Sequence, residues 1–208
     1  VGHNLQAHIT ELEKRMRTMT RVCGLLVLLA AMTATAGEAP ADALSALPAH
    51  IAVDSRLHAS AQPTAQMIAN LPAAGVRTVI NLRPASETPE LDEKALVEKA
   101  GMQYRSLPIA GAAGLTRDNV TAFDRLLGEA RDGQVLVHCA SGNRVGAMMA
   151  LRARWIEGKS PEESLAIGKS SGLKGLEGDV KALLQAGADT PNAGADAVTG
   201  ASPYRQQN

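Results

Sequence analysis

A cysteine and an arginine five positions apart are the residues of this chain whose types and spacing point most directly to chemistry. They are Cys139 and Arg144, and the residues between them are Ala140, Ser141, Gly142 and Asn143. The apolar residues 135–137 precede the cysteine, which indicates a buried strand that ends in a short turn before a helix. Unpaired backbone amides converge in such a turn, so it is suited to binding an anion.

Each residue type in this loop has a chemical use. The partial positive charge at a helix amino terminus favours thiolate over thiol, so Cys139 is placed to act as a nucleophile. The guanidinium of Arg144 offers two parallel donors that suit two oxygens of a tetrahedral oxyanion. Gly142 permits a tight turn, and Ser141 supplies a hydroxyl. We predict catalytic roles for Cys139 and Arg144, and substrate binding by the residues between them, Ala140, Ser141, Gly142 and Asn143.

The neighbouring His138 has a different predicted role. Successive side chains of a strand alternate in direction, so His138 points away from Cys139. We expect it to orient the loop by a hydrogen bond, in preference to acting as a general base. The alternative for the whole segment is a packed cysteine and a solvent-facing arginine in an ordinary strand-to-helix turn.

The elements that must position this loop alternate along the chain. Extended apolar segments predict strands, and amphipathic segments predict helices. Ser160, Pro161 and Glu163 form the pattern of a capped helix start, and a glycine-rich break separates that helix from a final short one. Alternating strands and helices imply an α/β fold, a three-layer sandwich with a mostly parallel central sheet. The predicted strands cover residues 76–82, 102–109 and 134–138, and the predicted helices cover residues 64–74, 89–100, 116–130 and 144–157.

The two ends of the chain are predicted to lie outside this fold. Arginines, an apolar run over residues 22–31 and the small residues Ala34-Thr35-Ala36 follow one another in the order of a signal peptide, at about residues 16–36. We expect an exported, periplasmic protein with no stable membrane insertion once the signal is removed; an uncleaved anchor is the alternative. The predicted organisation is an upstream segment and signal peptide over 1–36, a linker over 37–50, a domain over 51–186 and a disordered tail over 187–208.

Composition bears on the ligands and partners that the chain could bind. Lys plus Arg and Asp plus Glu both total 21, so the chain has no basic bias that would predict nucleic-acid binding. The five histidines show no metal-ligand spacing, and we predict no metal and no cofactor. Since Cys23 would leave with the signal, Cys139 would remain as a single reactive thiol.

The pattern His138-Cys139-x-x-Gly142-x-Arg144 resembles the signature of cysteine-dependent phosphatases. Further segments, 60–64, 75–84 with Glu87, 101–104 and 107–109, make residues 50–175 similar to the bacterial beta-lactamase-hydrolase-like, phosphatase-like domain family. This resemblance implies a dual-specificity-phosphatase-like fold. It also implies hydrolysis of phosphate esters through a phospho-cysteine intermediate, on a phosphorylated small molecule or protein.

Two features depart from the phosphatase pattern. Arg144 follows Cys139 by five positions, where the phosphatase loop has six, so the loop is one residue shorter. In addition, residues 108–115 contain no carboxylate, although the general acid of the family is expected there. Glu87 and Asp118 are the candidates for that acid or for a supporting role, together with Arg83 and His138 as possible supports.

Two other functions remain open from the sequence. The six-residue loop from Cys139 to Arg144 also resembles the active loop of rhodanese-type sulfurtransferases, in which the cysteine carries a persulfide. Against this, Asn81-Leu82-Arg83 replaces the Asp-x-Arg of those enzymes. The third possibility is a catalytically inactive module that holds an anion or a phosphorylated ligand.

Overall fold

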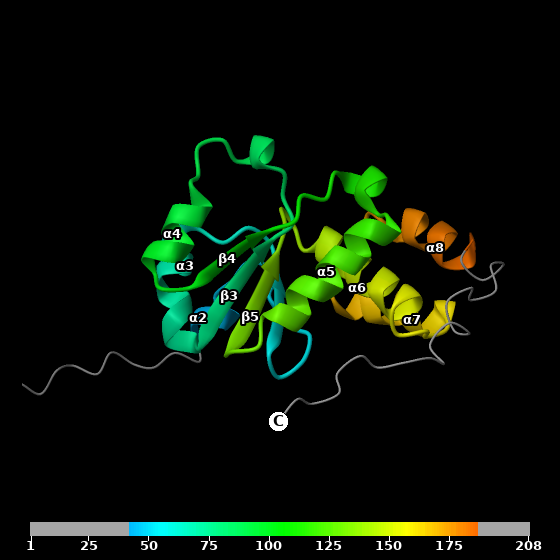
Figure 1. The fold of residues 1–208 in the computed structure, drawn as a ribbon, viewed down its shortest axis with the longest axis horizontal. Coiled ribbons are helices and arrows are strands. Elements are labelled where there is room, and N and C mark those ends of the chain that lie inside the picture. The colour runs from blue at the N-terminus through cyan, green and yellow to red at the C-terminus, as the bar shows by residue number, and fades with distance from the viewer. Residues whose placement is uncertain (1–41, 187–208) are drawn as a thin grey trace, which may run out of the picture. The chain divides into compact units, whose positions relative to one another are not determined.

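A five-stranded sheet forms the centre of the molecule (Figure 1). The computed structural model describes residues 42–186, which lie in one compact unit. The strand order is β1-β2-β5-β3-β4, with β1 antiparallel to β2 and the remaining neighbours parallel. The predicted α/β fold with a mostly parallel sheet is therefore confirmed. The strands are β1 (Ile51–Ala52), β2 (Leu57–Ser60), β3 (Val76–Asn81), β4 (Gln103–Ser106) and β5 (Gln134–His138).

The helices begin where the sequence supplies caps. Thr64, Asp92 and Thr116 each accept a backbone N–H at a helix start, and Ser160 forms the predicted capping box with Glu163. The helices are α2 (Asp42–Ser45), α3 (Ala65–Asn70), α4 (Glu93–Lys99), α5 (Arg117–Glu129), α6 (Asn143–Trp155), α7 (Pro161–Ser170) and α8 (Glu177–Ala186). Short 3-10 turns cover Leu71–Ala74, Ala85–Glu87 and Gly111–Gly114.

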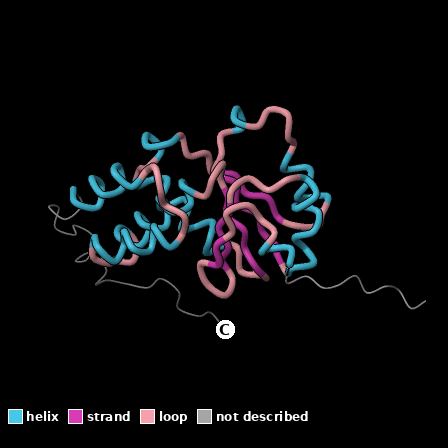
Figure 2. Tube along the Cα trace, turned by 180° about the vertical axis from the view of Figure 1, so that it is seen from behind, coloured by secondary structure: helices cyan, strands magenta, loops and turns pink. Residues whose placement is uncertain are grey.

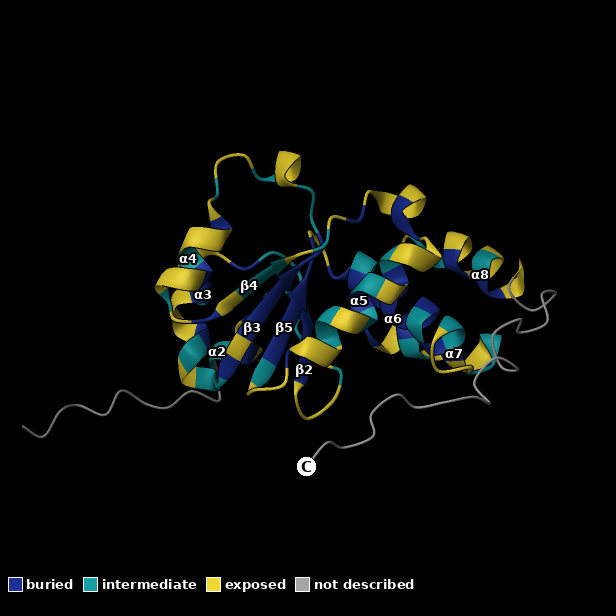
Figure 3. Cartoon of the chain, in the orientation of Figure 1, coloured by how far each residue is buried: buried dark blue, intermediate teal, exposed yellow. Residues whose placement is uncertain are grey.

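Helices cover both faces of the sheet, which gives the predicted three layers. On one face, Val79 and Leu136 pack with apolar residues of α2, α3 and α4. On the other face, Leu82 and Val137 pack with residues of α5, α6 and α8. Figure 2 shows the strands enclosed between the two groups of helices, and in Figure 3 the buried residues follow the strands and the inner sides of the helices. The loop after β5 thus leaves the central strand of a sheet that is packed on both sides.

The predicted linker is ordered from residue 42 onward. Helix α2 and the turn after it bury Leu44 and Leu47 against the first of these two cores. The backbone N–H of Ala61 also donates to the carbonyl of Pro48, at 2.8 Å. Within the predicted linker over residues 37–50, the part from residue 42 onward is therefore packed against the domain.

Strands β1 and β2 were not predicted. They are short, and the polar residues His58 and Ser60 interrupt the apolar pattern of β2, although both are buried. Strand β2 pairs directly with β5 and brings residues 60–62 beside the cysteine loop. It therefore forms part of the framework of the site.

The predictions for the two ends fall outside the described residues. The segment 1–36 with its signal peptide, Cys23 within it, and the tail 187–208 all lie there, so export stays a prediction. Among the helices between residues 42 and 186, none combines the length and apolar character that crossing a lipid bilayer requires.

Candidate active site

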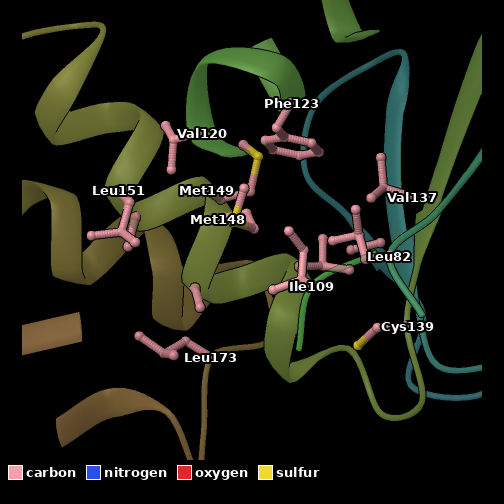
Figure 4. Packing of buried hydrophobic residues seen from close by; sticks show 14 of the residues in the cluster. Leu82, Ile109, Val120, Phe123, Val137, Cys139, Met148, Met149, Leu151 and Leu173 are labelled. Atoms are coloured by element: carbon pink, nitrogen blue, oxygen red, sulfur yellow. The ribbon is translucent and has the colours of Figure 1, made fainter. Parts of the chain in front are cut away.

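The cysteine loop closes over the thiol of Cys139. Gly142 adopts a left-handed conformation, with φ 83°, and caps α6. Its backbone N–H donates to Sγ of Cys139 at 3.1 Å. Figure 4 shows Cys139 at the margin of the apolar cluster, at the end of β5. The thiol is thus buried at the base of a tight turn, and the amide of Gly142 is directed at the sulfur.

Both neighbouring strands hold the backbone of this loop. The N–H of Cys139 donates to the carbonyl of Ser60 at 3.4 Å, and the carbonyl of His138 accepts from Leu82 at 2.9 Å. Beyond the cysteine, Gln62 donates through its backbone to Ala140, and Ser141 forms an isolated bridge with Ala61. The side chains of Ala140 and Ser141 are exposed. The loop is therefore pinned through its main chain, which leaves those two side chains on the surface.

Asn143 supports the loop from below. Its Oδ1 accepts the backbone N–H of Lys174 at 2.8 Å and that of Leu176 at 3.3 Å. These bonds join the start of α6 to the segment between α7 and α8. Because Oδ1 is engaged in this way, a substrate contact from Asn143 would involve its backbone amide or its side-chain nitrogen.

Arg144 connects the cysteine loop with the loops that follow β3 and β4. Its Nη1 donates to the carbonyl of Ile109 at 3.0 Å and to that of Leu82 at 3.4 Å. Its Nη1 and Nη2 also bind the two carboxylate oxygens of Glu87, at 2.9 and 2.6 Å. The Nη1–Nη2 edge of the guanidinium is therefore anchored, and the edge formed by Nε and Nη2 keeps donors for an oxyanion.

Glu87 is held as a carboxylate. The hydrogen bond from Arg144 lowers its pKa, partial burial opposes this, and Arg83 lowers it further. In turn, the pKa of Arg144 is raised: burial works against the charge, but Glu87 and the nearby Cys139 outweigh it. A carboxyl with a lowered pKa gives up its proton readily and does not hold it for a leaving group at neutral pH. Of the two roles that the sequence left to Glu87, the geometry favours support of Arg144.

Arg83 extends this polar cluster. Its Nε donates to Oε2 of Glu87 at 3.1 Å, and its Nη2 donates to the backbone carbonyl of Glu87 at 2.7 Å. Its Nη1 donates to Oε1 of Gln62 at 2.8 Å. With an exposed fraction of 12% for its side chain, Arg83 is mostly buried and is not the loose surface ion pair that a pattern of this kind often gives.

His138 lies on the opposite side of β5 from Cys139, as strand alternation predicted. It is completely buried, and its Nε2 lies 2.6 Å from Oε1 of Glu93, although the two atoms do not meet at hydrogen-bond angles. Neither ring nitrogen has a hydrogen-bond partner among the described residues, so the predicted hydrogen bond from His138 to the loop is not found and is corrected to a close contact with Glu93. The sequence analysis did not single out Glu93, because an acid in the first turn of a helix is typical of any helix start. It also missed Asn81, Gln62 and Tyr104, which join the same buried cluster.

No hydrogen bond or ion pair joins Asp118 to the cysteine loop in the described residues. Asp118 is exposed in the first turn of α5, where its charge complements the helix dipole. The segment between β4 and α5 contributes the carbonyl of Ile109 to the site but no carboxylate. Within residues 42–186 there is also no group of three or more His, Cys, Asp or Glu side chains placed to hold a metal ion.

Solved structures with a similar fold include a protein assigned as a phosphatase and the protein Tk-PTP. A DUF442 protein from Shewanella putrefaciens CN-32, assigned as a phosphatase, matches with a TM-score of 0.55 and 25% identity, over 70% of this chain and 96% of the other. Tk-PTP in its active form matches with a TM-score of 0.51 and 19% identity, over 69% of this chain and 99% of the other. The second likeness concerns the fold alone.

Curated relatives match over the same region. The beta-lactamase hydrolase-like protein of Xylella fastidiosa is 33% identical over 126 residues, which are 58% of this chain and 28% of that protein. The protein of the same name from Agrobacterium fabrum is 31% identical over 105 residues, 49% of this chain and 24% of the relative. This chain thus corresponds to less than a third of their length. The family model for the beta-lactamase hydrolase-like protein, phosphatase-like domain matches residues 49–154, and the chain belongs to this family.

Proposed function

We propose that this protein is a cysteine-dependent hydrolase of phosphate esters. The observation that carries the proposal is the joint placement of Cys139 and Arg144. The sulfur accepts the N–H of Gly142 in a pinned loop, and an arginine whose other edge is anchored by Glu87 stands beside it. The family and the phosphatase assignment of the Shewanella protein support the same chemistry.

The reaction has two steps, formation of a phospho-cysteine and its hydrolysis. The thiolate of Cys139 attacks phosphorus, an Sγ–P bond forms, and the ester P–O bond breaks with its electron pair on the leaving oxygen. Water then attacks the phospho-cysteine, the Sγ–P bond breaks, and inorganic phosphate and the thiolate result. The loop amides and the free edge of Arg144 hold the phosphoryl oxygens in both steps.

The leaving group receives its proton from solvent in this scheme. Glu87 is held ionised by Arg144, and Asp118 is an exposed acid in the first turn of α5 with no bond to the loop, so neither of the two candidate acids is suited to the task. The site should therefore favour esters whose leaving oxygen is already stable as an anion, such as aryl phosphates, over alkyl phosphates. The natural substrate would be a phosphorylated small molecule or protein with such a leaving group.

Hydrolysis of nitrophenyl phosphate by the full chain tests this function. We expect release of phosphate that is lost in Cys139→Ser and kept in Cys23→Ser, the matched change at the other cysteine of the chain. Equal activity in the Cys139→Ser variant would contradict the proposal. A single-turnover reaction quenched in base should trap phosphate on the peptide that contains Cys139.

The short spacing, with Arg144 five positions after Cys139, favours one second candidate, a sulfurtransferase. In that reaction the thiolate attacks the outer sulfur of thiosulfate, sulfite leaves, and a persulfide remains on Cys139; cyanide then removes the outer sulfur as thiocyanate. Thiocyanate formation without phosphate release would establish this candidate in place of the hydrolase. Absence of both reactions, with sulfate still bound, would identify an anion-binding module.

A further inference from the structure

A buried polar cluster lies behind the cysteine loop, on the face of the sheet that Cys139 does not use. Its centre is Glu93, the first residue of α4, whose exposed fraction is only 3%. Oε1 of Glu93 faces Nε2 of His138 at 2.6 Å, and Oε2 accepts from Nδ2 of Asn81 at 3.0 Å and from Nε2 of Gln62 at 3.2 Å. Burying a carboxylate is costly unless partners surround it in this way.

One branch from Glu93 leads to the nucleophile. His138 is the residue before Cys139, and it is aligned with Ser60 on β2 and with Asn81 on β3. The contact between Glu93 and the imidazole restrains the end of β5 from the face opposite the thiol. Because Cys139 is the next residue in the chain, this restraint also fixes the position of its backbone and therefore of its side chain.

A second branch leads to the arginine. Gln62 donates to Glu93 through Nε2 and accepts from Arg83 through Oε1, so its amide bridges the two side chains. Arg83 then binds Glu87, and Glu87 binds Arg144. A continuous series of polar contacts thus runs from Glu93 to the group that would hold the oxyanion. The members of such a network orient one another and act as a unit.

We infer that Glu93 is a positioning residue for the cysteine loop: it orients Cys139 through His138 and Arg144 through Gln62, Arg83 and Glu87. The inference deepens the proposed function, since it concerns the same site, but it requires only that the loop binds an oxyanion. Packing alone does not account for Glu93, because an apolar residue would fill the same volume without the cost of burying a charge.

Sulfate binding to the full chain, measured by titration calorimetry, tests the inference without any turnover. Glutamine has one oxygen where glutamate has two, so Glu93→Gln cannot keep both the oxygen that faces His138 and the oxygen that accepts from Gln62. We expect it to weaken sulfate binding about tenfold, as small misplacements in a site do. The matched control is Glu98→Gln on the same helix, where the glutamate is exposed and lies 4.0 Å from Lys94. It should bind sulfate as the unchanged chain does.

A second variant separates positioning from a general loss of packing. Gln62→Ala breaks only the branch to Arg144, and it should also weaken sulfate binding about tenfold. The double variant should be no weaker than Glu93→Gln, because both changes interrupt one series of contacts. Losses that multiply to about a hundredfold would overturn the inference, as would native affinity in Glu93→Gln. If Glu93→Gln does not fold, native affinity in Gln62→Ala would overturn the branch to Arg144.

Turnover gives a further readout and keeps this inference apart from the proposed function. On nitrophenyl phosphate, Glu93→Gln should lower kcat and raise KM, whereas Gln62→Ala should raise KM alone, since the His138 branch is intact. A chain that binds sulfate but hydrolyses no phosphate ester refutes the hydrolase and leaves the sulfate test valid. A chain that binds no sulfate overturns the inference itself.

Discussion

Two arginines on helix α6 hold carboxylates in similar ways but at opposite ends of the helix. Arg144 lies in the first turn of α6 and binds Glu87. Arg152 lies in the last turn and binds Asp124 of α5 at 2.8 Å and also Glu157. Cations are favoured at the carboxyl end of a helix and disfavoured at the amino end. Arg152 therefore stands where helix electrostatics would place it, whereas Arg144 does not.

The other helices sharpen this contrast. Among the described helices of seven or more residues, α4, α5, α7 and α8 all carry an acid in the first turn, and α6 carries none. The partial positive charge at the amino end of α6 is thus not offset by an acid in its first turn, and Arg144 adds a further positive charge there. Such an arrangement is unfavourable for the isolated helix and favourable once an anion, a thiolate or a bound oxyanion, lies in the loop. On the proposed function, Arg144 is the cation of the site and Arg152 is a structural one.

Replacing each arginine by lysine should separate the two roles, and this is the largest effect we expect. Arg144→Lys loses the planar fork that holds two oxygens, so kcat/KM on nitrophenyl phosphate should fall by about a hundredfold or more. Arg152→Lys should leave kcat/KM unchanged and lower the free energy of unfolding by about 1 kcal/mol or less. Steady-state kinetics and urea unfolding of both variants measure this. Equal losses of activity in the two variants would remove the distinction between the arginines.

The close packing of Gly146, in the first turns of α6, against the backbone of Gly168 and Leu173 gives the next largest expected effect, a loss of stability on substitution. A Cβ built on Gly146 would lie 2.1 Å from the backbone nitrogen of Leu173 and 2.6 Å from the carbonyl oxygen of Gly168. Because backbone atoms must move to admit it, Gly146→Ala should lower the free energy of unfolding by about 1–3 kcal/mol. Chemical denaturation followed by circular dichroism measures the change.

Gly128→Ala in α5 is the matched control for this substitution. Nothing lies within 4 Å of a Cβ at Gly128, and alanine is the better helix former. The control should therefore gain about 0.5–1 kcal/mol. A stable Gly146→Ala protein with full activity would show that the half of α6 that carries Arg144 does not depend on this close packing.

Much of this architecture was predictable because its signals are local. The loop from Cys139 to Arg144 is one contiguous segment, and the strand before it and the capped helices show their periods directly. Strands β1 and β2 escaped prediction, since two or four residues with polar members carry no clear alternation. Leu44 and Leu47 escaped for a similar reason, because two apolar residues in a short stretch define no period.

The partners of the loop were harder to predict because the fold, and not the sequence, makes them neighbours. Glu87 lies 57 positions before Arg144, and no sequence pattern links the two residues. Glu93 carries no sequence signal that distinguishes it from an ordinary acid at a helix start. What distinguishes Glu93 from other acids at helix starts is its burial in contact with His138, Asn81 and Gln62. Asp118 has the same sequence context and is exposed.

The pairing of Glu87 with Arg144 predicts the smallest effect, a dependence of stability on pH. The hydrogen bond from Arg144 holds the pKa of Glu87 below its ordinary value of 4.5, burial acts in the opposite direction, and Arg83 adds to the lowering. A group whose pKa is lower in the folded state contributes stability above its unfolded pKa, and that stability is lost as the pH falls through the folded pKa. With a third of the Glu87 side chain exposed, solvent screening limits the contribution to about 1 kcal/mol or less.

Urea unfolding of the unchanged chain and of Glu87→Gln between pH 7 and pH 3 measures this contribution. Because glutamine does not titrate, the difference in unfolding free energy between the two proteins isolates the carboxylate. The difference should be constant from pH 7 to about pH 5 and should shrink only below the ordinary glutamate pKa of 4.5. A difference that already shrinks near pH 6 would mean that Arg144 does not hold Glu87 ionised, and Glu87 would return as a candidate for the general acid. A difference that stays constant down to about pH 5 would mean that Arg144 keeps Glu87 ionised over this range.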